Sequence, residues 1–208
     1  MQYKIYTMIT SYENAVIVGS LLGDLHIQKN SGLTSRCRLR FCHSIKQKEY
    51  VDWKYAVFKK NFCKTTKLPY QTNRDEYLFY TSYSECFVNY HSMWYQNLKK
   101  IVPRNIEQLL IDPVALAIWY LDDGTKRNYN ACRFATQSFS LQENLLLQST
   151  LETNFKLIVK LEQWWNKKTQ KHLYGLYIPS EKESFLTFKN IIYSFVKTEI
   201  PSMLYKLE

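Results

Sequence analysis

The chain has 208 residues, of which 46% are hydrophobic and 16% aromatic, and its 28 Lys and Arg outnumber its 18 Asp and Glu. This length allows one sizeable domain or two small fused domains, and the aromatic content excludes a disordered chain. The net charge of +10 is spread along the sequence, which favours a polyanionic partner over an ordinary basic protein.

No membrane segment is predicted, because the longest apolar run, 15–23, is far shorter than the roughly 20 residues that a bilayer requires. The N-terminal residues lack both the Arg-rich character of a transit peptide and the apolar core of a secretory signal. The five cysteines include no C-x-x-C pair, which indicates neither a zinc site nor a disulfide framework and favours a reducing compartment. Because no targeting signal is predicted, we expect that a protein of this sequence acting in an organelle is also made there.

The first helix is predicted to begin at Thr10, which forms a capping box with Glu13. Its apolar stretch leads directly into Asp24. Gly19 and Gly23 lie four residues apart and share one helix face, so another helix backbone can approach closely. We therefore expect this helix to pack against a second helix.

A strand with a cationic face is predicted at 35–42, where Arg36, Arg38 and Arg40 alternate with apolar residues. Such a face can hold phosphates or read the bases of a DNA major groove, although an ordinary charged solvent face explains any single arginine equally well. Weaker candidates for DNA contacts are Gln28, Lys29, Arg74, Gln137, Lys160 and Lys171.

The rest of the first half is predicted as a helix at 46–61, a strand at 77–81 and a further helix from about 85 to 99. The second half opens on a helix with Asp112 at its N-cap and Pro113 at its first position. Gly124 is the expected stop of that helix.

The second half then repeats the order of elements in the first. Its elements are a strand near 133–139, a helix near 141–155, strands near 157–165 and 173–178, and a helix near 184–196. This order predicts an α+β fold of two pseudo-symmetric halves, 1–103 and 104–208, without a flexible linker between them.

Asp24 and Asp123 each follow an apolar stretch of helical length, 123 − 24 = 99 residues apart. The carbonyls at a helix C-terminus carry partial negative charge, so an acid there is disfavoured by up to about 1 kcal/mol and a positive partner is expected. If the two helices pack side by side and parallel, both carboxylates emerge at one end. Their oxygens suit Mg²⁺, which can supply water for hydrolysis of a phosphodiester.

The segments 17–24 and 116–124 resemble the paired motifs of the LAGLIDADG homing endonuclease family, in its monomeric form with two motifs. Stretches at 99–103, 136–139 and 200–207 are similar to group I intron-encoded members from organelles. The resemblance covers nearly the whole chain. It implies two αββαββα halves with saddle-shaped antiparallel sheets around a central two-helix interface.

The resemblance also implies that Asp24 and Asp123 are catalytic ligands of Mg²⁺ or of another divalent cation such as Mn²⁺, while Asp122 is structural or peripheral. It implies basic residues at the scissile phosphates, which match Lys100 and Lys206. Solvated surface lysines are the alternative for both positions. The two lysines lie at different distances from the prolines near them, so the repeat itself does not pair them.

The two motifs depart from the family pattern at Leu25 and Ile118, where Gly is usual. We therefore expect an asymmetric seam, in which the first helix offers a groove and Ile118, Trp119 and Tyr120 supply bulk. The four histidines show no metal-ligand spacing, and His26 is the one near the expected site.

The expected function is that of a monomeric site-specific endonuclease that cuts both strands of a long asymmetric double-stranded DNA target. Two dissimilar halves can read different half-sites, whereas a homodimer is confined to near-palindromes. One alternative is a group I intron RNA maturase, and another is a DNA-binding protein that does not cut. Both motif acids, Asp24 and Asp123, are present, which favours cleavage without excluding a role in splicing. The expected location is the mitochondrion or plastid, with the protein encoded by the organelle itself.

Overall fold

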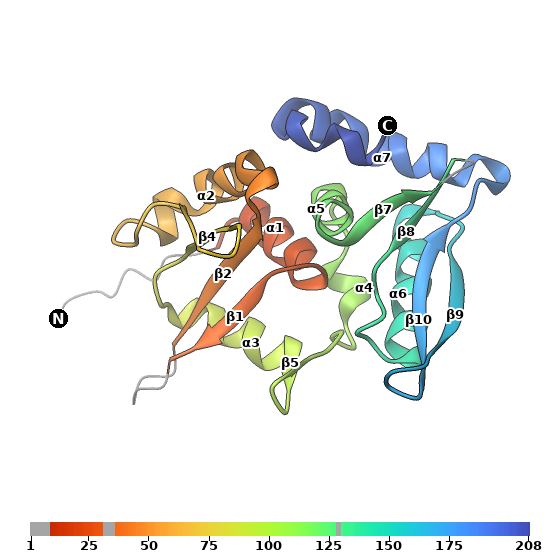
Figure 1. The fold of residues 1–208 in the computed structure, drawn as a ribbon, viewed down its shortest axis with the longest axis horizontal. Helices are drawn as coiled ribbons and strands as arrows, with labels where there is room; N and C mark the ends of the chain where they lie inside the picture. Colours follow the sequence, from red (N-terminus) through yellow and green to blue (C-terminus); the bar gives the residue numbers. More distant parts are fainter. Residues whose placement is uncertain (1–8, 31–35, 128–129) are drawn as a thin grey trace.

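The computed structural model describes residues 9–30, 36–127 and 130–208. Two repeats of one α+β topology lie on either side of a central pair of helices (Figure 1). None of the helices in these ranges has the length and apolar character needed to cross a bilayer. The predicted strand at 35–42 starts at residue 35, which lies outside the described residues.

The first repeat has the order αββαββα and one antiparallel sheet, with strand order β1-β2-β4-β3. Its elements are α1 (Ser11–Leu22), β1 (His26–Lys29), β2 (Cys37–Ser44), α2 (Lys48–Phe62), β3 (Tyr70–Gln71), β4 (Glu76–Tyr80) and α3 (Val88–Trp94). Short 3-10 turns, η1 (Ile45–Gln47) and η2 (Glu85–Phe87), precede α2 and α3.

The second repeat has the same order and a matching antiparallel sheet, β7-β8-β10-β9. Its elements are α5 (Pro113–Asp123), β7 (Gly124–Arg127), β8 (Ala131–Phe134), α6 (Leu141–Phe155), β9 (Lys160–Asn166), β10 (Lys171–Ile178), η3 (Glu181–Glu183), α7 (Ser184–Glu199) and η4 (Pro201–Lys206). The repeats are joined by a hairpin, β5 (Tyr95–Gln96) and β6 (Lys99–Lys100), and by the short α4 (Ile106–Leu109). The predicted fold class and repeat are confirmed.

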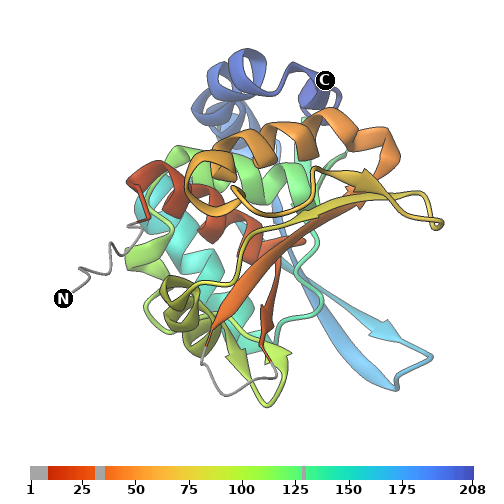
Figure 2. The same ribbon diagram turned by 90° about the vertical axis from the view of Figure 1, so that its left-hand side faces the viewer.

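Helices cover one face of each sheet, while the strands splay away from the central helices on the other side (Figure 2). In β2 the predicted alternation is confirmed, because Cys37, Leu39 and Phe41 are buried and the arginines between them are partly exposed. Phe41 stacks on Phe58 of α2 with ring centroids 5.0 Å apart. The arginine face is therefore left without a covering helix.

Two predicted elements were placed wrongly. The helix expected over 85–99 ends at Trp94, because Asn97 and Leu98 have positive φ and turn the chain into the β5–β6 hairpin. The strand expected over 133–139 ends at Phe134. The segment after it turns towards α6, where the Asn144 side chain donates to the carbonyls of Thr136, Phe139 and Ser140.

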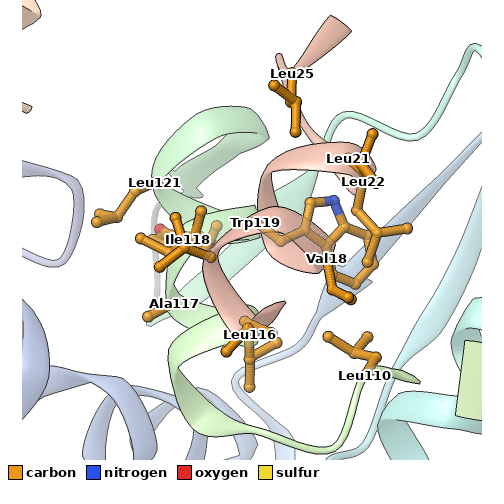
Figure 3. Packing of buried hydrophobic residues seen from close by; sticks show 14 of the residues in the cluster. Val18, Leu21, Leu22, Leu25, Leu110, Leu116, Ala117, Ile118, Trp119 and Leu121 are labelled. Carbon is orange, nitrogen blue, oxygen red and sulfur yellow. The ribbon is translucent and has the colours of Figure 1, made fainter. Parts of the chain in front are cut away.

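The close approach of α1 and α5 was predicted and is confirmed. A Cβ on Gly19 would lie 2.3 Å from the carbonyl oxygen of Ala115, and a Cβ on Gly23 would lie 2.4 Å from the Cβ of Asp122. Since both contacts advance in the same chain direction, the two helices are parallel. Figure 3 shows this seam, where Val18 of α1 lies near Trp119 of α5 in the buried cluster.

Bulk at the seam comes from fewer residues than expected. Ile118 faces Gly19, with its Cβ 2.9 Å from where a Cβ of Gly19 would be. Tyr120 instead faces the core of its own repeat, with its ring 4.9 Å from that of Phe188, so the prediction was wrong for this residue. Its hydroxyl donates to the carbonyl of Lys206 at 2.8 Å.

Replacement of Gly19 by Ala should destabilise the protein by about 1–3 kcal/mol, because the added methyl group meets the α5 backbone, which cannot move without opening the seam. Denaturant unfolding measures this loss. Ser149→Ala, at an exposed position of α6, is the control and should stay within about 0.5 kcal/mol of the wild type. Equal stability of Gly19→Ala and the control would contradict the tight seam.

Candidate active site

Asp24 and Asp123 lie at the same end of the central helix pair. Asp24 follows Gly23, the C-cap of α1, and Asp123 is the last residue of α5. Because α1 and α5 are parallel, one carboxylate from each repeat reaches a common region. The charge of Asp24 contributes to the raised pKa of Asp123, so the two carboxylates are close enough to interact. The structure therefore brings the two predicted ligands together.

Lys100 and Lys206 bind the carbonyl ends of the two motif helices. The Lys100 ammonium donates to the Gly23 carbonyl at 2.7 Å. The Lys206 ammonium donates to the carbonyls of Leu121 at 2.6 Å and Gly124 at 3.1 Å. These lysines supply the positive charge that the helix ends require. Lys100 lies in the hairpin that follows the first repeat and Lys206 in η4 of the second, so the structure gives the two lysines matching contacts although their sequence positions do not pair them.

Burial raises the pKa of Asp123 to about 7, and the nearby charges of Asp24 and Asp122 add to this effect. Lys100 and Lys206 act in the opposite direction but do not overcome it. Burial also lowers the pKa of both lysines below its usual range. A cation beside Asp123 would favour its ionised form, which burial opposes.

Asp24 behaves differently from Asp123. Burial alone would raise its pKa, but the hydrogen bond from His43 and the charges of Lys54 and Lys100 hold it below its usual value. The Nδ1 of His43 lies 3.3 Å from Oδ2 of Asp24. Sequence reasoning missed His43, because a lone histidine on a strand carries no spacing signal that links it to Asp24.

Behind His43 lies a buried ion pair that joins the two repeats. The ammonium of Lys54, on α2, donates to Oδ1 of Asp122 at 2.7 Å and contacts Nε2 of His43 at 3.0 Å. Tyr50 donates its hydroxyl to the same Asp122 oxygen at 2.7 Å. The other Asp122 oxygen accepts the backbone N–H of Asp24 at 3.3 Å. These contacts hold Asp122 between the two repeats, and its structural or peripheral role stays a prediction.

The donor atoms near the site fit a metal at one place and not at another. Asp24, His43 and Asp122 offer ligand atoms within 4.8 Å of one another. The Lys54 ammonium already lies between His43 and Asp122, however, so a second cation there would be repelled. Asp24 and Asp123 fit better, because Asp24 is 45% exposed at its side chain and both offer hard carboxylate oxygens.

The arginine face of the first sheet carries Arg38, Arg40 and Gln28 of the predicted DNA contacts. The strand register places Gln28 opposite Arg38 and His26 opposite Arg40, so all four share this face. Arg38 donates a hydrogen bond from Nε to the side-chain oxygen of Gln28 at 3.0 Å. Its guanidinium lies 4.0 Å from the centroid of the Tyr80 ring.

The other predicted contacts of the first repeat are less well placed. Arg36 lies 3.3 Å from Glu85 at the edge of the sheet, and Arg74 is exposed in the turn between β3 and β4. Lys29 pairs with Cys37 in the register, which puts it on the side opposite the arginines. Only its position at the strand end leaves it exposed.

In the second repeat, the register places Arg133, Tyr177 and Lys160 on one face. Lys160 lies 2.5 Å from Glu181, and Lys171 is exposed at the start of β10. A shallow hollow beside the paired carboxylates is lined by Asp123, Thr125, Arg133, Ala135, Gln137, Trp164 and Leu173. Of the predicted DNA contacts in this repeat, Gln137 thus lines the same hollow as Asp123.

Two arginines on this face were missed by the sequence analysis. Arg127 and Arg133 both contact Glu162, at 2.8 Å and 2.7 Å. Arg133 also lies 4.4 Å from the Trp164 ring centroid. Their strands are only four residues long, which is too short for an alternation pattern to identify which side chains face outward.

The sequence matches the LAGLIDADG DNA endonuclease family over residues 14–186. It is 30% identical over 200 residues to the cytochrome b mRNA maturase bI2 of Debaryomyces hansenii, covering 92% of this chain and 72% of the relative. It is 28% identical over 217 residues to the DNA endonuclease I-ChuI of Chlamydomonas applanata, covering 96% and 95%. The chain therefore belongs to the LAGLIDADG family.

Solved structures show the same fold. The homing endonuclease I-WcaI, bound to its DNA recognition sequence, superposes with a TM-score of 0.80 at 23% identity, covering 99% of this chain and 89% of that one. I-DmoI in complex with DNA and Mn superposes with a TM-score of 0.54 at 14% identity, covering 87% and 96%.

The opposite pKa shifts of the two acids predict opposite effects of Asp→Asn changes on the metal-free protein. The pKa of Asp123 is raised from 3.8 to about 7, so its contribution to stability is present below pH 3.8 and is lost as pH rises through 7. Asp123→Asn should therefore melt above the wild type at pH 8, by about 2–4 °C for each kcal/mol relieved, with the difference vanishing near pH 4.

Asp24→Asn is the matched comparison. Because the pKa of Asp24 is lowered, its contribution to stability is present above 3.8 and is lost as pH falls through the folded value. This variant should melt below the wild type at pH 8. Thermal melts in a chelator at several pH values measure both differences, and shifts of the same sign would contradict the assigned electrostatics.

Proposed function

We propose that this protein is a monomeric site-specific endonuclease that hydrolyses both strands of a long asymmetric double-stranded DNA target. The observation that carries the proposal is the pair of carboxylates, Asp24 and Asp123, at the common end of two parallel helices from two repeats. Each repeat adds one lysine beside its own carboxylate. One chain thus contains two similar halves of a site, as cleavage of the two strands of a DNA duplex requires.

The proposed cofactor is a divalent cation, Mg²⁺ or Mn²⁺, held by Asp24 and Asp123. When bound, it would polarise phosphate oxygens and lower the pKa of a water molecule. I-DmoI, which has the same fold, is described in complex with DNA and Mn and in complex with DNA and Ca. The raised pKa of Asp123 supports the proposal, because a nearby cation would favour the ionised form.

Lys100 and Lys206 are proposed to stabilise charge at the scissile phosphates. Both ammonium groups are held at fixed positions by backbone carbonyls. A positive group that is already oriented need not reorganise when charge develops during the reaction, which is the main source of electrostatic catalysis.

The two sheets are proposed to hold the DNA. The uncovered faces carry Arg38 and Arg40 in the first repeat and Arg127 and Arg133 in the second. The contacts of these arginines differ between the repeats, so different half-sites would be read. A net charge of +10 would strengthen association with any polyanion.

A second candidate function is RNA maturation. It is favoured by the similarity to the maturase of D. hansenii, the chain of which this protein covers 72%. The relatives include proteins named intron-encoded endonucleases, which supports the proposal that an intron, in an organelle, encodes this protein as well. A maturase function would not require either carboxylate.

The proposal is tested by selecting a DNA target from a randomised library and measuring cleavage in Mg²⁺ and in Ca²⁺. Asp24→Asn and Asp123→Asn should each lose more than about 100-fold in rate, exceeding the 10–100-fold typical of outer-shell partners. The control is Asp112→Asn, which changes an acid at the opposite end of α5 and preserves its N-cap.

The outcomes separate the candidate functions. Discrete double-strand cuts in Mg²⁺ that persist only in the control support the endonuclease. No cleavage of any library member, together with binding and splicing of group I intron RNA that survives Asp24→Asn, would overturn the endonuclease and leave the maturase.

A further inference from the structure

The side chains of Asp122, Lys54 and His43 form a cluster that is almost completely buried. The side chains are 0%, 1% and 2% exposed. Removing two charges from water costs several kcal/mol per ion, and a buried ion pair is often no more stabilising than apolar residues of the same volume. The cluster ends at Asp24, a proposed metal ligand. Its position therefore indicates a role in the site.

The hydrogen-bonding capacity of Lys54 determines which nitrogen of His43 carries a hydrogen. A lysine ammonium has donors and no acceptor. Its contact with Nε2 of His43 at 3.0 Å therefore requires a free lone pair on Nε2. The imidazole hydrogen then lies on Nδ1, which is the nitrogen 3.3 Å from the Asp24 carboxylate.

Asp122 and Tyr50 hold Lys54 in the orientation that this requires. The ammonium donates to Asp122 at 2.7 Å and lies 4.3 Å from the centroid of the Tyr50 ring. Asp122 itself is 3.7 Å from Nε2 of His43, which is too far for a hydrogen bond. A charge in the second repeat thus acts through Lys54 on a histidine in the first.

We propose that Lys54, held by Asp122, fixes His43 in the tautomer with hydrogen on Nδ1, and that His43 thereby positions the Asp24 carboxylate. His43 is a positioning residue, because it acts through Asp24. The order is Asp122, Lys54, His43, Asp24, and it crosses the seam between the two repeats. The part of the inference that concerns the reaction rests on the proposed function.

The second repeat has no equivalent of the contact between His43 and Asp24. His26 and Thr125 each lie two residues after the motif acid and pair with Arg40 and Arg133, which aligns the two sheets. By this alignment the position of His43 corresponds to Thr136. Thr136 donates to Asn144 at 2.5 Å instead. The positioning should therefore act on one carboxylate and on one DNA strand.

The tautomer is tested first, in the metal-free wild-type protein, so that the result does not depend on any cleavage. Nitrogen-15 NMR correlation of the histidine rings should show His43 with a hydrogen on Nδ1 and none on Nε2. In Lys54→Met, Nε2 no longer accepts from the ammonium and faces the Asp122 carboxylate, so Nε2 should gain a hydrogen. A wild-type His43 with a hydrogen on Nε2, or on both nitrogens, would overturn the proposal.

The positioning is tested with two amide variants that differ in where the donor lies. In His43→Asn the amide nitrogen can take the place of Nδ1, whereas in His43→Gln it extends to that of Nε2. On the library-selected DNA in Mg²⁺, His43→Gln should cut one strand about 10–100-fold more slowly and accumulate nicked product. His43→Asn should retain more of this activity.

The measurement compares single-turnover rates for each strand, together with DNA affinity in Ca²⁺, which should be unchanged in both variants. Equal slowing of both strands, or equal rates for Asn and Gln, would overturn the positioning role. Should the wild type fail to cut, the endonuclease proposal fails while the tautomer measured by NMR still stands or falls separately.

Discussion

The contact between the backbones of α1 and α5 determines the rest of the structure. Gly19 and Gly23 let the helices approach until a side chain on either would overlap α5. Their parallel arrangement then places two negative helix ends and two carboxylates in one region. Such a concentration of negative charge is unfavourable unless cations are built in. Lys100 and Lys206 bind the carbonyls, and Lys54 binds the acid buried between the helices.

The two repeats share a topology but not their charges. Gly23 and Asp122 occupy equivalent places just before the motif acids and face each other, so the Asp122 side chain fits because Gly23 has none. This exchange puts a carboxylate of the second repeat inside the first, where Lys54 and Tyr50 bind it. The first repeat thereby gains a polar cluster that the second does not have. The two repeats therefore differ at the seam although they share one topology.

Local signals predicted the helices well, because capping boxes, N-cap residues and alternation depend on near neighbours. Thr10 with Glu13 and Asp112 with Pro113 lie where the sequence places them. The site was predictable only in part. Asp24 and Asp123 stand out at helix ends. Lys54 shares a helix face with Tyr50 and Phe58, but the sequence does not indicate its partner. Its burial depends on Asp122, 68 residues away, and Arg133 likewise acquires its place from Glu162. Contacts of this kind leave no periodic trace.

The opposite pKa shifts of Asp24 and Asp123 follow from the same asymmetry. The protein itself supplies Asp24 with a hydrogen bond from His43 and with the charges of Lys54 and Lys100, which keep it ionised despite burial. Asp123 has lysines nearby, but burial and two other carboxylates outweigh them. Asp123 therefore lacks enough nearby positive charge to offset its burial, whereas the Asp24 carboxylate is oriented by the hydrogen bond from His43. A divalent cation shared by the two would find one ligand already oriented and would supply the charge that the other lacks.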